Sequence, residues 1–325
     1  MTEEKYIDSL ISMLRKNMEN DYLKGTTKRD AHPKTLGLLK AEFKVVKDLP
    51  EFLRVGLFKE AKSYNSFIRI SSSSPKVEGD DKKDARGFAI KLINVQGAKV
   101  LKDEKNTQDF ILLSNEVFPF SSLKAFHDLV YARDKGKLPC YVVKTILKGD
   151  LPNLIKLAVI PKNQTSPFDI SYFSTTAYKF GGNVVRYCIV PRNHQMSKMP
   201  KDMTASYLSN NMQKQLDEEK IIFDFKVQIQ KEGMKDDPSI IWSKRKSPYI
   251  KVAEIIIDKQ NVMDKKRNDL AELLSFNVGH SLIEHTPIGE FNRARMKIYT
   301  ELSKFRHLRN GEKLLEPTNS DFNLI

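Results

Sequence analysis

The sequence predicts an α+β fold, in which an antiparallel β-barrel carries helical insertions and flanking helices. Short segments rich in Val, Ile and Phe follow one another between polar turns over residues 39–113 and return further along the chain. Segments with helical spacing lie at both ends of the chain and in its longer insertions, without the regular alternation that a parallel sheet requires. Strands joined by hairpins, with helices placed outside them, are typical of a barrel that carries helices.

The N-terminal half begins with an amphipathic helix and continues as strands. In residues 3–24, apolar side chains recur at helical spacing. Polar turns such as EGDDKKD separate the expected strands AEFKVV, FIRISSS, GFAIKLINV and DFILLS. A helix is expected over residues 121–134, and a strand at LIKLAVIP.

The C-terminal half continues the same pattern. The segments SYFSTTAYKF and NVVRYCIV flank Gly181-Gly182-Asn183, which indicates a hairpin. Helices are expected over residues 202–219, 262–275 and 289–308, and strands at IIFDFKVQIQ and YIKVAEIIID. Because no internal repeat or long linker divides the chain, one domain is expected over residues 1–325, with an N-terminal helix in residues 1–25 and a C-terminal tail at residues 311–325.

Composition restricts the class of protein. The apolar fraction is 40%, and no apolar run approaches the roughly 20 residues of a transmembrane helix. The start, MTEEKYIDSLISML, is acidic and amphipathic, unlike a signal peptide. Cys140 and Cys188 are far apart and lie in apolar, strand-like settings, so both are expected to be buried thiols. These features favour a cytoplasmic protein without a transmembrane segment.

The net charge of +14 has two interpretations. A basic protein attracts nucleic acid, anionic membrane surfaces or carboxylate substrates. Alternatively, the lysines form an ordinary solvated surface, and their scatter between Lys5 and Lys313, interleaved with Asp and Glu, favours this second interpretation. No nucleic-acid partner is expected.

Two segments hold residues suited to chemistry, since the usual nucleotide, hydrolase and zinc-protease motifs are missing. The first is Arg29-Asp30-Ala31-His32-Pro33-Lys34. Its histidine could act as a general acid or base, although a loop histidine on its own is more often an ordinary surface residue.

The second segment is a helix that carries Arg295, Tyr299 and Arg306. Arg295 and Tyr299 are four residues apart and share one helix face, and Arg306 lies about two turns further along. A guanidinium beside a phenol favours the phenolate, which is a ligand for ferric iron. Spacing alone favours the simpler interpretation of an exposed charged helix.

Six fragments in serial order across residues 29–310 together resemble the haem catalases. Arg29-Asp-Ala-His32 resembles the segment that carries the distal histidine, and Phe67-Ile-Arg69-Ile-Ser-Ser resembles the strand whose arginine meets a haem propionate. Asp84-Ala-Arg-Gly-Phe-Ala-Ile-Lys91 is close to the family's DPRGFAVK. The remaining fragments are NTQDF at residues 106–110 with VFP at 117–119, IIWSKRKSPYIKVAEIIID at 240–258, and Arg295-x-x-x-Tyr299 with Arg306.

The resemblance implies a catalase-like barrel with haem b and a specific set of site residues. Tyr299 would ligate the iron, Arg295 would keep it ionised, and Arg29, Arg69 and Arg306 would balance the propionates and the tyrosinate. His32 would be the distal acid/base and Asn106 the distal amide, while Phe88 and Phe118 would cover the porphyrin. For each of the two phenylalanines, a core position is the competing interpretation.

Departures from the family's pattern resemble its small catalase-related branch, which includes bacterial peroxidases and allene oxide synthases. The long N-terminal arm and the C-terminal flavodoxin-like or NADPH-binding region of larger catalases are not seen. One extra residue precedes Asn106, so Lys105 could stand at the distal amide position instead.

These features imply an enzyme that consumes hydrogen peroxide or an organic hydroperoxide, as a peroxidase with modest catalase activity. The sequence does not identify its electron donor, and a homodimer is the largest assembly expected. A fatty-acid hydroperoxide isomerase or lyase and a non-catalytic haem-binding protein are the alternatives.

Overall fold

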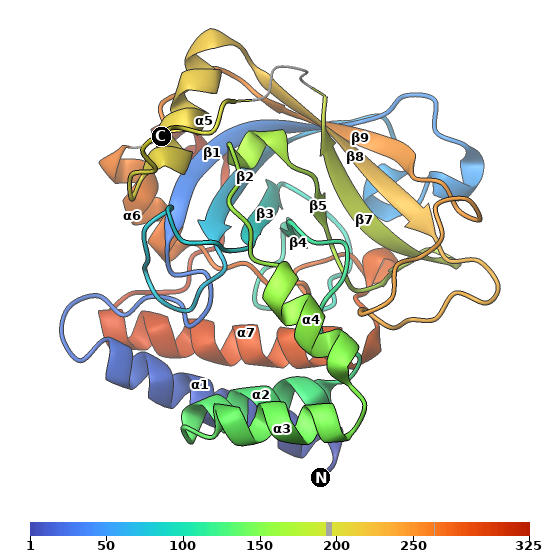
Figure 1. Ribbon diagram of the computed structural model, residues 1–325. Helices are drawn as coiled ribbons and strands as arrows, with labels where there is room; N and C mark the ends of the chain where they lie inside the picture. Colours follow the sequence, from blue (N-terminus) through green and yellow to red (C-terminus); the bar gives the residue numbers. More distant parts are fainter. Residues whose placement is uncertain (193–196, 263) are drawn as a thin grey trace.

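The structure is a computed structural model that describes residues 1–192, 197–262 and 264–325, and in it a β-barrel lies above a layer of helices (Figure 1). Its strands are β1 (Thr35–Val45), β2 (Ser63–Ser72), β3 (Arg86–Ile93), β4 (Thr107–Leu113), β5 (Tyr172–Phe173), β6 (Tyr178–Phe180), β7 (Asn183–Pro191), β8 (Ile221–Ile229) and β9 (Ile250–Ile257). Its α-helices are α1 (Glu3–Asp21), α2 (Leu123–Asp134), α3 (Leu138–Leu147), α4 (Leu151–Val159), α5 (Tyr207–Glu218), α6 (Lys265–Leu273), α7 (Gly289–Asn310) and α8 (Asn319–Leu324).

All described strand pairings are antiparallel, and they close the barrel. The order β5-β4-β3-β2-β1-β9-β8-β7 returns to its start because the two-residue strand β5 pairs with both β4 and β7. The predicted hairpin around Gly181 is confirmed as the pairing of β6 with β7. The predicted antiparallel barrel with helical insertions is therefore confirmed.

Strand alternation separates an inner face from an outer face of the barrel wall. Ile68 and Ile70 of β2 are buried in the main core, whereas Arg69 and Ser71 between and after them point outward. Aromatic rings fill the interior: Phe225 lies 5.1 Å from Phe43 and 4.8 Å from Phe110 between ring centroids. An eight-stranded barrel is just wide enough to be filled by side chains. A large ligand would therefore have to bind outside the wall.

Helix α7 lies between the barrel and the remaining helices of the layer (Figure 1). Its Phe291, Ala294 and Ile298 form a second apolar cluster with Leu10 of α1 and Leu123 of α2. The side of α7 that does not face α1 and α2 is left to meet the barrel. This arrangement places α7 opposite the outer face of the wall.

The insertion between β4 and β5 corrects two sequence predictions. LIKLAVIP is not a strand, because most of it forms α4, in which Leu151, Ile155 and Val159 recur at helical spacing. Cys140 lies on the neighbouring helix α3 and is exposed, so the prediction of a buried thiol is wrong there. It is correct for Cys188 of β7, where burial raises the pKa of the thiol to about 12.

No helix within the described residues is both long enough and apolar enough to cross a bilayer.

Candidate functional site between the barrel wall and helix α7

His32 lies in the connection between α1 and β1, against the start of β3. Its Nδ1 is 3.0 Å from Oγ of Ser71 in β2, and a Cβ atom at Gly87 would lie 2.7 Å from that same Nδ1. The backbone of His32 has a φ of 60°, in the left-handed region that non-glycine residues rarely adopt. Arg69 stabilises this turn by donating a hydrogen bond to the His32 carbonyl oxygen at 2.7 Å. Three strand residues thus hold the imidazole in one orientation.

The surroundings of His32 favour its neutral form. Burial lowers the pKa of His32 to about 4, and the nearby charge of Arg69 acts in the same direction. The side chain nevertheless keeps accessible surface, which is expected of a group that faces a narrow space rather than a packed core. In the tautomer that donates its Nδ1 proton to Ser71, Nε2 is free to accept a proton.

Arg29, Arg69 and Arg306, the three residues predicted to bind carboxylates, lie close enough to one another for their charges to interact. Arg29 donates from Nη2 to the carbonyl oxygens of Ala271 and Leu274, at 2.7 and 2.5 Å, where α6 ends. Arg306 donates to Glu272 O and, at 3.4 Å, to Leu274 O. Arg69 donates to Thr35 Oγ1 at 2.7 Å.

This arginine cluster carries more positive than negative charge. Among the described residues, Glu272 is the one carboxylate within 4.0 Å of any of the three, at 3.2 Å from Arg29. Burial, reinforced by the charge of Arg29, lowers the pKa of Arg306 to about 9 and also lowers that of Arg69. The Nε of Arg69 is buried without a hydrogen-bond partner. Unpaired donors and uncompensated charge are costly when buried, so the cluster is suited to an anionic ligand.

Arg295 and Tyr299 form a second group one helical turn apart on α7. Nε of Arg295 donates to Oη of Tyr299 at 3.2 Å, and its Nη1 reaches Thr176 Oγ1 at 3.2 Å and Asn292 Oδ1 at 3.3 Å. No carboxylate of the described chain lies within ion-pair distance of this guanidinium. Although burial opposes its charge, the phenols of Tyr299 and Tyr178 raise the pKa of Arg295. An ionised Tyr299 would give Arg295 the counter-charge that it lacks.

The two groups on α7 face the same part of the barrel as His32. The charge of Arg306 contributes to the lowered pKa of Arg69 in β2, and the charge of Arg295 contributes to the lowered pKa of His32. Segments 29–32, 69–71 and 295–306, which are far apart in sequence, therefore converge. The structure brings together a neutral histidine, a cationic cluster and a tyrosine–arginine pair.

Asn106 does not join this site, which corrects the prediction of a distal amide. It precedes β4 at the end where Thr107 pairs with Ile93, whereas His32 lies beside Gly87 at the opposite end of β3. Its Oδ1 accepts a hydrogen bond from the exposed Gln96 at 3.0 Å. Asn106 therefore lies in the β3–β4 connection, at the end of these strands that is far from His32.

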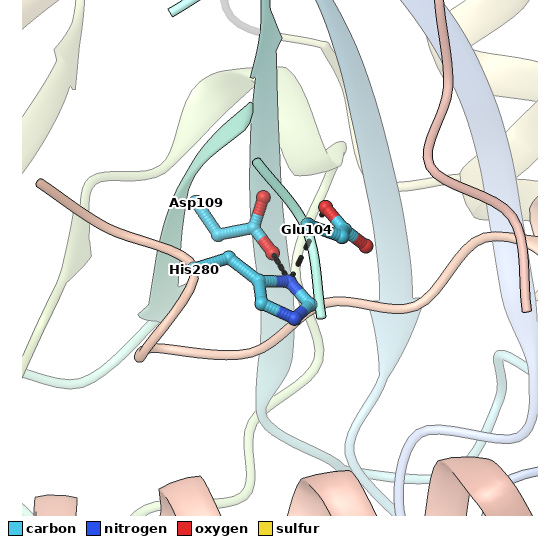
Figure 2. A group of neighbouring side chains, drawn as sticks. All are labelled: Glu104, Asp109 and His280. Carbon is cyan, nitrogen blue, oxygen red and sulfur yellow. Dashed lines mark hydrogen bonds and ion pairs between the residues drawn. The ribbon is translucent and has the colours of Figure 1, made fainter. Parts of the chain in front are cut away.

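A buried charged cluster, Lys91 with Glu104, Asp109 and His280, lies along the same strands (Figure 2 shows the last three). His280 Nδ1 is 3.0 Å from Asp109 and 3.4 Å from Glu104, and its Nε2 is 3.2 Å from Asp103. Burial and the Lys91 charge disfavour the imidazolium, but hydrogen bonds to Asp103 and Asp109 outweigh them and raise the pKa of His280 to about 9. A cavity of about 100 Å³ lies between this cluster and Tyr299.

The charged cluster already contains its own cations. Glu104, Asp109 and His280 offer ligand atoms within 4.8 Å of one another, a spacing that could hold a metal ion. However, the Lys91 ammonium lies among them, in contact with Glu104, 2.8 Å from Asp109 and 3.3 Å from His280 Nδ1. Both carboxylates are therefore compensated by Lys91 and the protonated His280.

The two predicted porphyrin-covering phenylalanines lie in different places. Phe88 is fully buried inside the barrel, 5.0 Å from Tyr172 and 5.3 Å from Phe223 between ring centroids, so it points away from His32. This corrects the prediction that it covers a porphyrin. Phe118 packs against Phe291 of α7 in the apolar cluster that also includes Tyr299, so a position beside the site stays a prediction for it.

Three of the remaining histidines, His127, His285 and His307, lie in packed positions where they make hydrogen-bond contacts that support the fold. His285 is buried in the main core region, where its Nε2 accepts a hydrogen bond from Leu57 N at 3.1 Å. His127 contacts Ser9 of α1 at 2.9 Å, and His307 contacts Leu273 O at 2.8 Å. His194 lies outside the described residues.

Sequence reasoning missed Ser71, Gly87 and the charged cluster. Ser71 was detectable, because it follows Arg69 by two residues in a strand and so shares its outward face. Gly87 belongs to the Arg-Gly-Phe motif, and nothing in that motif indicates its contact with His32. The charged cluster needs three separated segments to meet, so no local pattern indicates it.

Neither the family models nor the curated proteins contain a match to this chain. Solved structures do resemble it. A fungal catalase has a TM-score of 0.70 at 14% identity, over 92% of this chain, and a bacterial catalase has a TM-score of 0.66 at 16% identity, over 94%. Catalase A from Saccharomyces cerevisiae has a TM-score of 0.70 at 15% identity, over 89%. The alignment spans 63% of the length of each of these proteins. The chain therefore has a catalase-like fold.

Proposed function

We propose that the chain binds ferric haem between the outer face of β2–β4 and helix α7, and that it consumes hydroperoxides. The observation that carries the proposal is the convergence of Arg295–Tyr299, a carboxylate-poor arginine cluster and a neutral His32. This set of residues fits the three needs of a haem with tyrosinate ligation: an anionic oxygen ligand, cations for two propionates, and a distal proton acceptor.

Each group would hold a defined part of the cofactor. Tyr299 Oη would ligate the iron, and the Arg295 guanidinium would keep it ionised. Arg29, Arg69 and Arg306 would bind the propionates, because arginine presents its donors in a fork that matches a carboxylate. The orphaned Nε of Arg69 is one donor available for this purpose. Phe118 would pack beside the ring.

The protein's own part in the reaction is proton transfer at His32. Bound haem would supply the redox chemistry that cleaves the peroxide O–O bond. Nε2 of His32 would accept the proton of an incoming hydroperoxide and return it to the leaving oxygen. Ser71 would hold the Nδ1 tautomer that makes Nε2 the acceptor, and the pKa of about 4 keeps the ring unprotonated before the substrate enters.

We assign the chain to the small catalase-related branch, as a peroxidase with modest catalase activity. Hydrogen peroxide or a small organic hydroperoxide would be the substrate, and a separate electron donor would complete turnover. The displacement of Asn106 supports low catalase activity, since no amide from that position orients the peroxide beside His32. As the second candidate, a fatty-acid hydroperoxide isomerase or lyase would use the same site residues on a larger substrate.

The position of Asn106 also favours one non-enzymatic function. A protein that binds haem without turning over peroxide would keep Tyr299, Arg295 and the arginine cluster but would not need a distal amide. Haem binding and catalysis must therefore be tested separately.

The absorption spectrum of the purified protein titrated with ferric haem tests the binding site. Wild type and Tyr64→Phe, a change of the same kind in β2 remote from α7, are expected to show a Soret band with high-spin ferric features. Tyr299→Phe is expected to lose or shift this band, because it removes the anionic ligand. An identical spectrum in Tyr299→Phe, or no haem uptake by wild type, would overturn the proposal.

The haem-loaded protein then decides between the candidate activities. Oxygen release or oxidation of an added donor with hydrogen peroxide would select the peroxidase. Conversion of a linoleate hydroperoxide alone would select the isomerase or lyase. Haem uptake with neither reaction would select the non-catalytic protein.

A further inference from the structure

Helices α3 and α4 expose a large apolar surface. Their solvent-exposed apolar side chains include Val143 at 55%, Leu147 at 80% and Ile155 at 52% relative exposure, and further members are Leu138, Val142, Ile146, Leu151 and Val159. Within α3 only Thr145 is buried. Monomeric soluble proteins rarely leave so many neighbouring apolar side chains in water, and such patches mark interaction surfaces.

The exposed apolar side chains follow helical spacing on both helices. In α3 they recur at 138, 142, 146 and at 143, 147, which covers about half of the helix circumference at 3.6 residues per turn. In α4 they recur at 151, 155 and 159. Figure 1 shows α3 at the outside of the helical layer and α4 rising from it toward the barrel, and a short turn joins the two helices. We call this unit, residues 138–159, the α3–α4 hairpin.

Positive charge surrounds the α3–α4 hairpin. Residues 133–162 contain seven lysines or arginines against two aspartates. Lys144 and Lys148 of this group are four residues apart on the polar face of α3, opposite its apolar arc, and both are exposed. An apolar face combined with a lysine-bearing polar face is the pattern of helices that lie in the interface of an anionic membrane.

We propose that the α3–α4 hairpin docks on the surface of an anionic lipid bilayer. Complementary charge supports this partner, because lysines close to an anionic surface attract it while the apolar side chains enter the headgroup region. A second copy of the chain is a poorer partner, since a two-fold contact would bring the same basic segment against itself. At ten and nine residues, the helices are about 15 and 14 Å long and lie along the surface.

Vesicle co-sedimentation of the full-length protein tests the docking. Vesicles of phosphatidylcholine alone are compared with vesicles that also contain phosphatidylglycerol, at low and high salt. Wild type is expected to bind the phosphatidylglycerol vesicles in a salt-sensitive manner and to bind phosphatidylcholine vesicles weakly. No haem is needed, so failure of this experiment leaves the proposed function untouched, and the reverse is also true.

Two double variants separate the apolar and charge contributions. Val143→Gln with Leu147→Gln is expected to lower the partition coefficient at least tenfold, because both side chains would lose their burial in lipid. Lys144→Gln with Lys148→Gln is expected to lower it about fivefold for each lysine removed. Leu23→Gln is the matched control, since Leu23 is also 80% exposed but lies in the loop after α1. All of these side chains are exposed, so the thermal unfolding midpoints should match that of wild type.

Three results would overturn the proposal. One is equal binding to both kinds of vesicle, which would remove the role of charge. Another is no vesicle binding together with a dimer in sedimentation velocity that Val143→Gln/Leu147→Gln dissociates, which would assign the surface to a second copy. The third is a monomer that binds neither vesicle.

Discussion

At the scale of single residues, the candidate site depends on small groups that make room for His32 and orient it. Ser71 fixes the ring through Nδ1, Arg69 holds its backbone, and Gly87 leaves the space that the ring fills. A side chain as small as alanine at position 87 would compete with the imidazole. Packing against His32, and not an unusual backbone conformation, therefore explains why a glycine occupies this position of the Arg-Gly-Phe motif.

Gly87→Ala is expected to displace His32 and lower hydroperoxide turnover about a hundredfold. The added Cβ would lie 2.7 Å from Nδ1 and 2.9 Å from Ser71 Oγ, so the ring must move, and a misplaced acid/base loses most of its effect. Turnover by the haem-loaded protein is measured beside its Soret band, which should persist because α7 is unchanged. Gly182→Ala is the control, since no atom lies within 4 Å of a Cβ there. Unchanged turnover in Gly87→Ala would refute the role given to this contact.

Residue identities were predictable from sequence only where a motif carried them. The His32, Arg69, Arg295, Tyr299 and Arg306 positions were predicted from the family resemblance, and the structure brings together the segments that carry them. The predictions for Phe88 and Asn106 were wrong although their motifs match, because a motif does not show where its residues lie in the paired strands. Phe88 faces the inside of the barrel, and Asn106 precedes β4 at the end far from His32.

At the scale of elements, α7 carries the site because its two sides have different partners. One side packs on α1 and α2, and the other meets α6 and the barrel through Arg306 and Arg295. Its helical spacing was clear in the sequence, and so were most barrel strands. The segment LIKLAVIP was misassigned because a short apolar run with branched side chains fits a buried strand as well as a helix. The helical assignment becomes clear only in the structure, where this segment follows helix α3 and is partly exposed to solvent.

Arg306→Gln is expected to weaken haem binding while sparing the haem-free protein. The substitution removes one of three buried guanidiniums that repel each other, so the free energy of unfolding without haem should stay equal or rise. A lost charge-assisted hydrogen bond of about 1.5–3 kcal/mol lowers haem affinity roughly ten- to a hundredfold. Haem titration and urea unfolding measure the two quantities.

The matched control for Arg306→Gln is Lys297→Gln. Lys297 is on the same helix but is exposed and pairs with Asp8 at 2.7 Å. It should leave both haem affinity and stability near wild type. If Arg306→Gln instead destabilises the haem-free protein strongly and binds haem normally, the arginine cluster is structural and is not a carboxylate site.

At the scale of the whole molecule, side chains fill the inside of the barrel, and α7 lies outside its wall (Figure 1). The sequence predicted the barrel because its strands and turns are local signals. The charged cluster of Lys91, Glu104, Asp109 and His280 was not predictable, because it joins β3, β4, the connection between them and the segment before α7. Their mutual pairing ties β3 and β4 of the barrel wall to that segment.

This long-range pairing makes stability depend on pH through His280. Its folded-state pKa of about 9 exceeds the unfolded value of 6.5, so folding binds the proton more tightly. Its contribution is therefore fully present below about pH 6.5 and is lost as pH rises toward 9. At 1.36 kcal/mol per pKa unit, the upper limit of this contribution is about 3 kcal/mol. His285 has the opposite sign: burial lowers its pKa to about 3, so its contribution is present above pH 6.5 and is lost as pH falls toward 3.

Urea unfolding of wild type, His280→Gln and His285→Gln across this pH range isolates the two effects. The stability advantage of wild type over His280→Gln should shrink between pH 6.5 and 9, because in this range wild type alone releases a proton when it unfolds. The advantage over His285→Gln should instead shrink on acidification, so each variant serves as the control for the other. A difference between wild type and His280→Gln that is independent of pH would mean that folding does not raise the pKa of His280. In that case Lys91 alone would compensate the buried carboxylates.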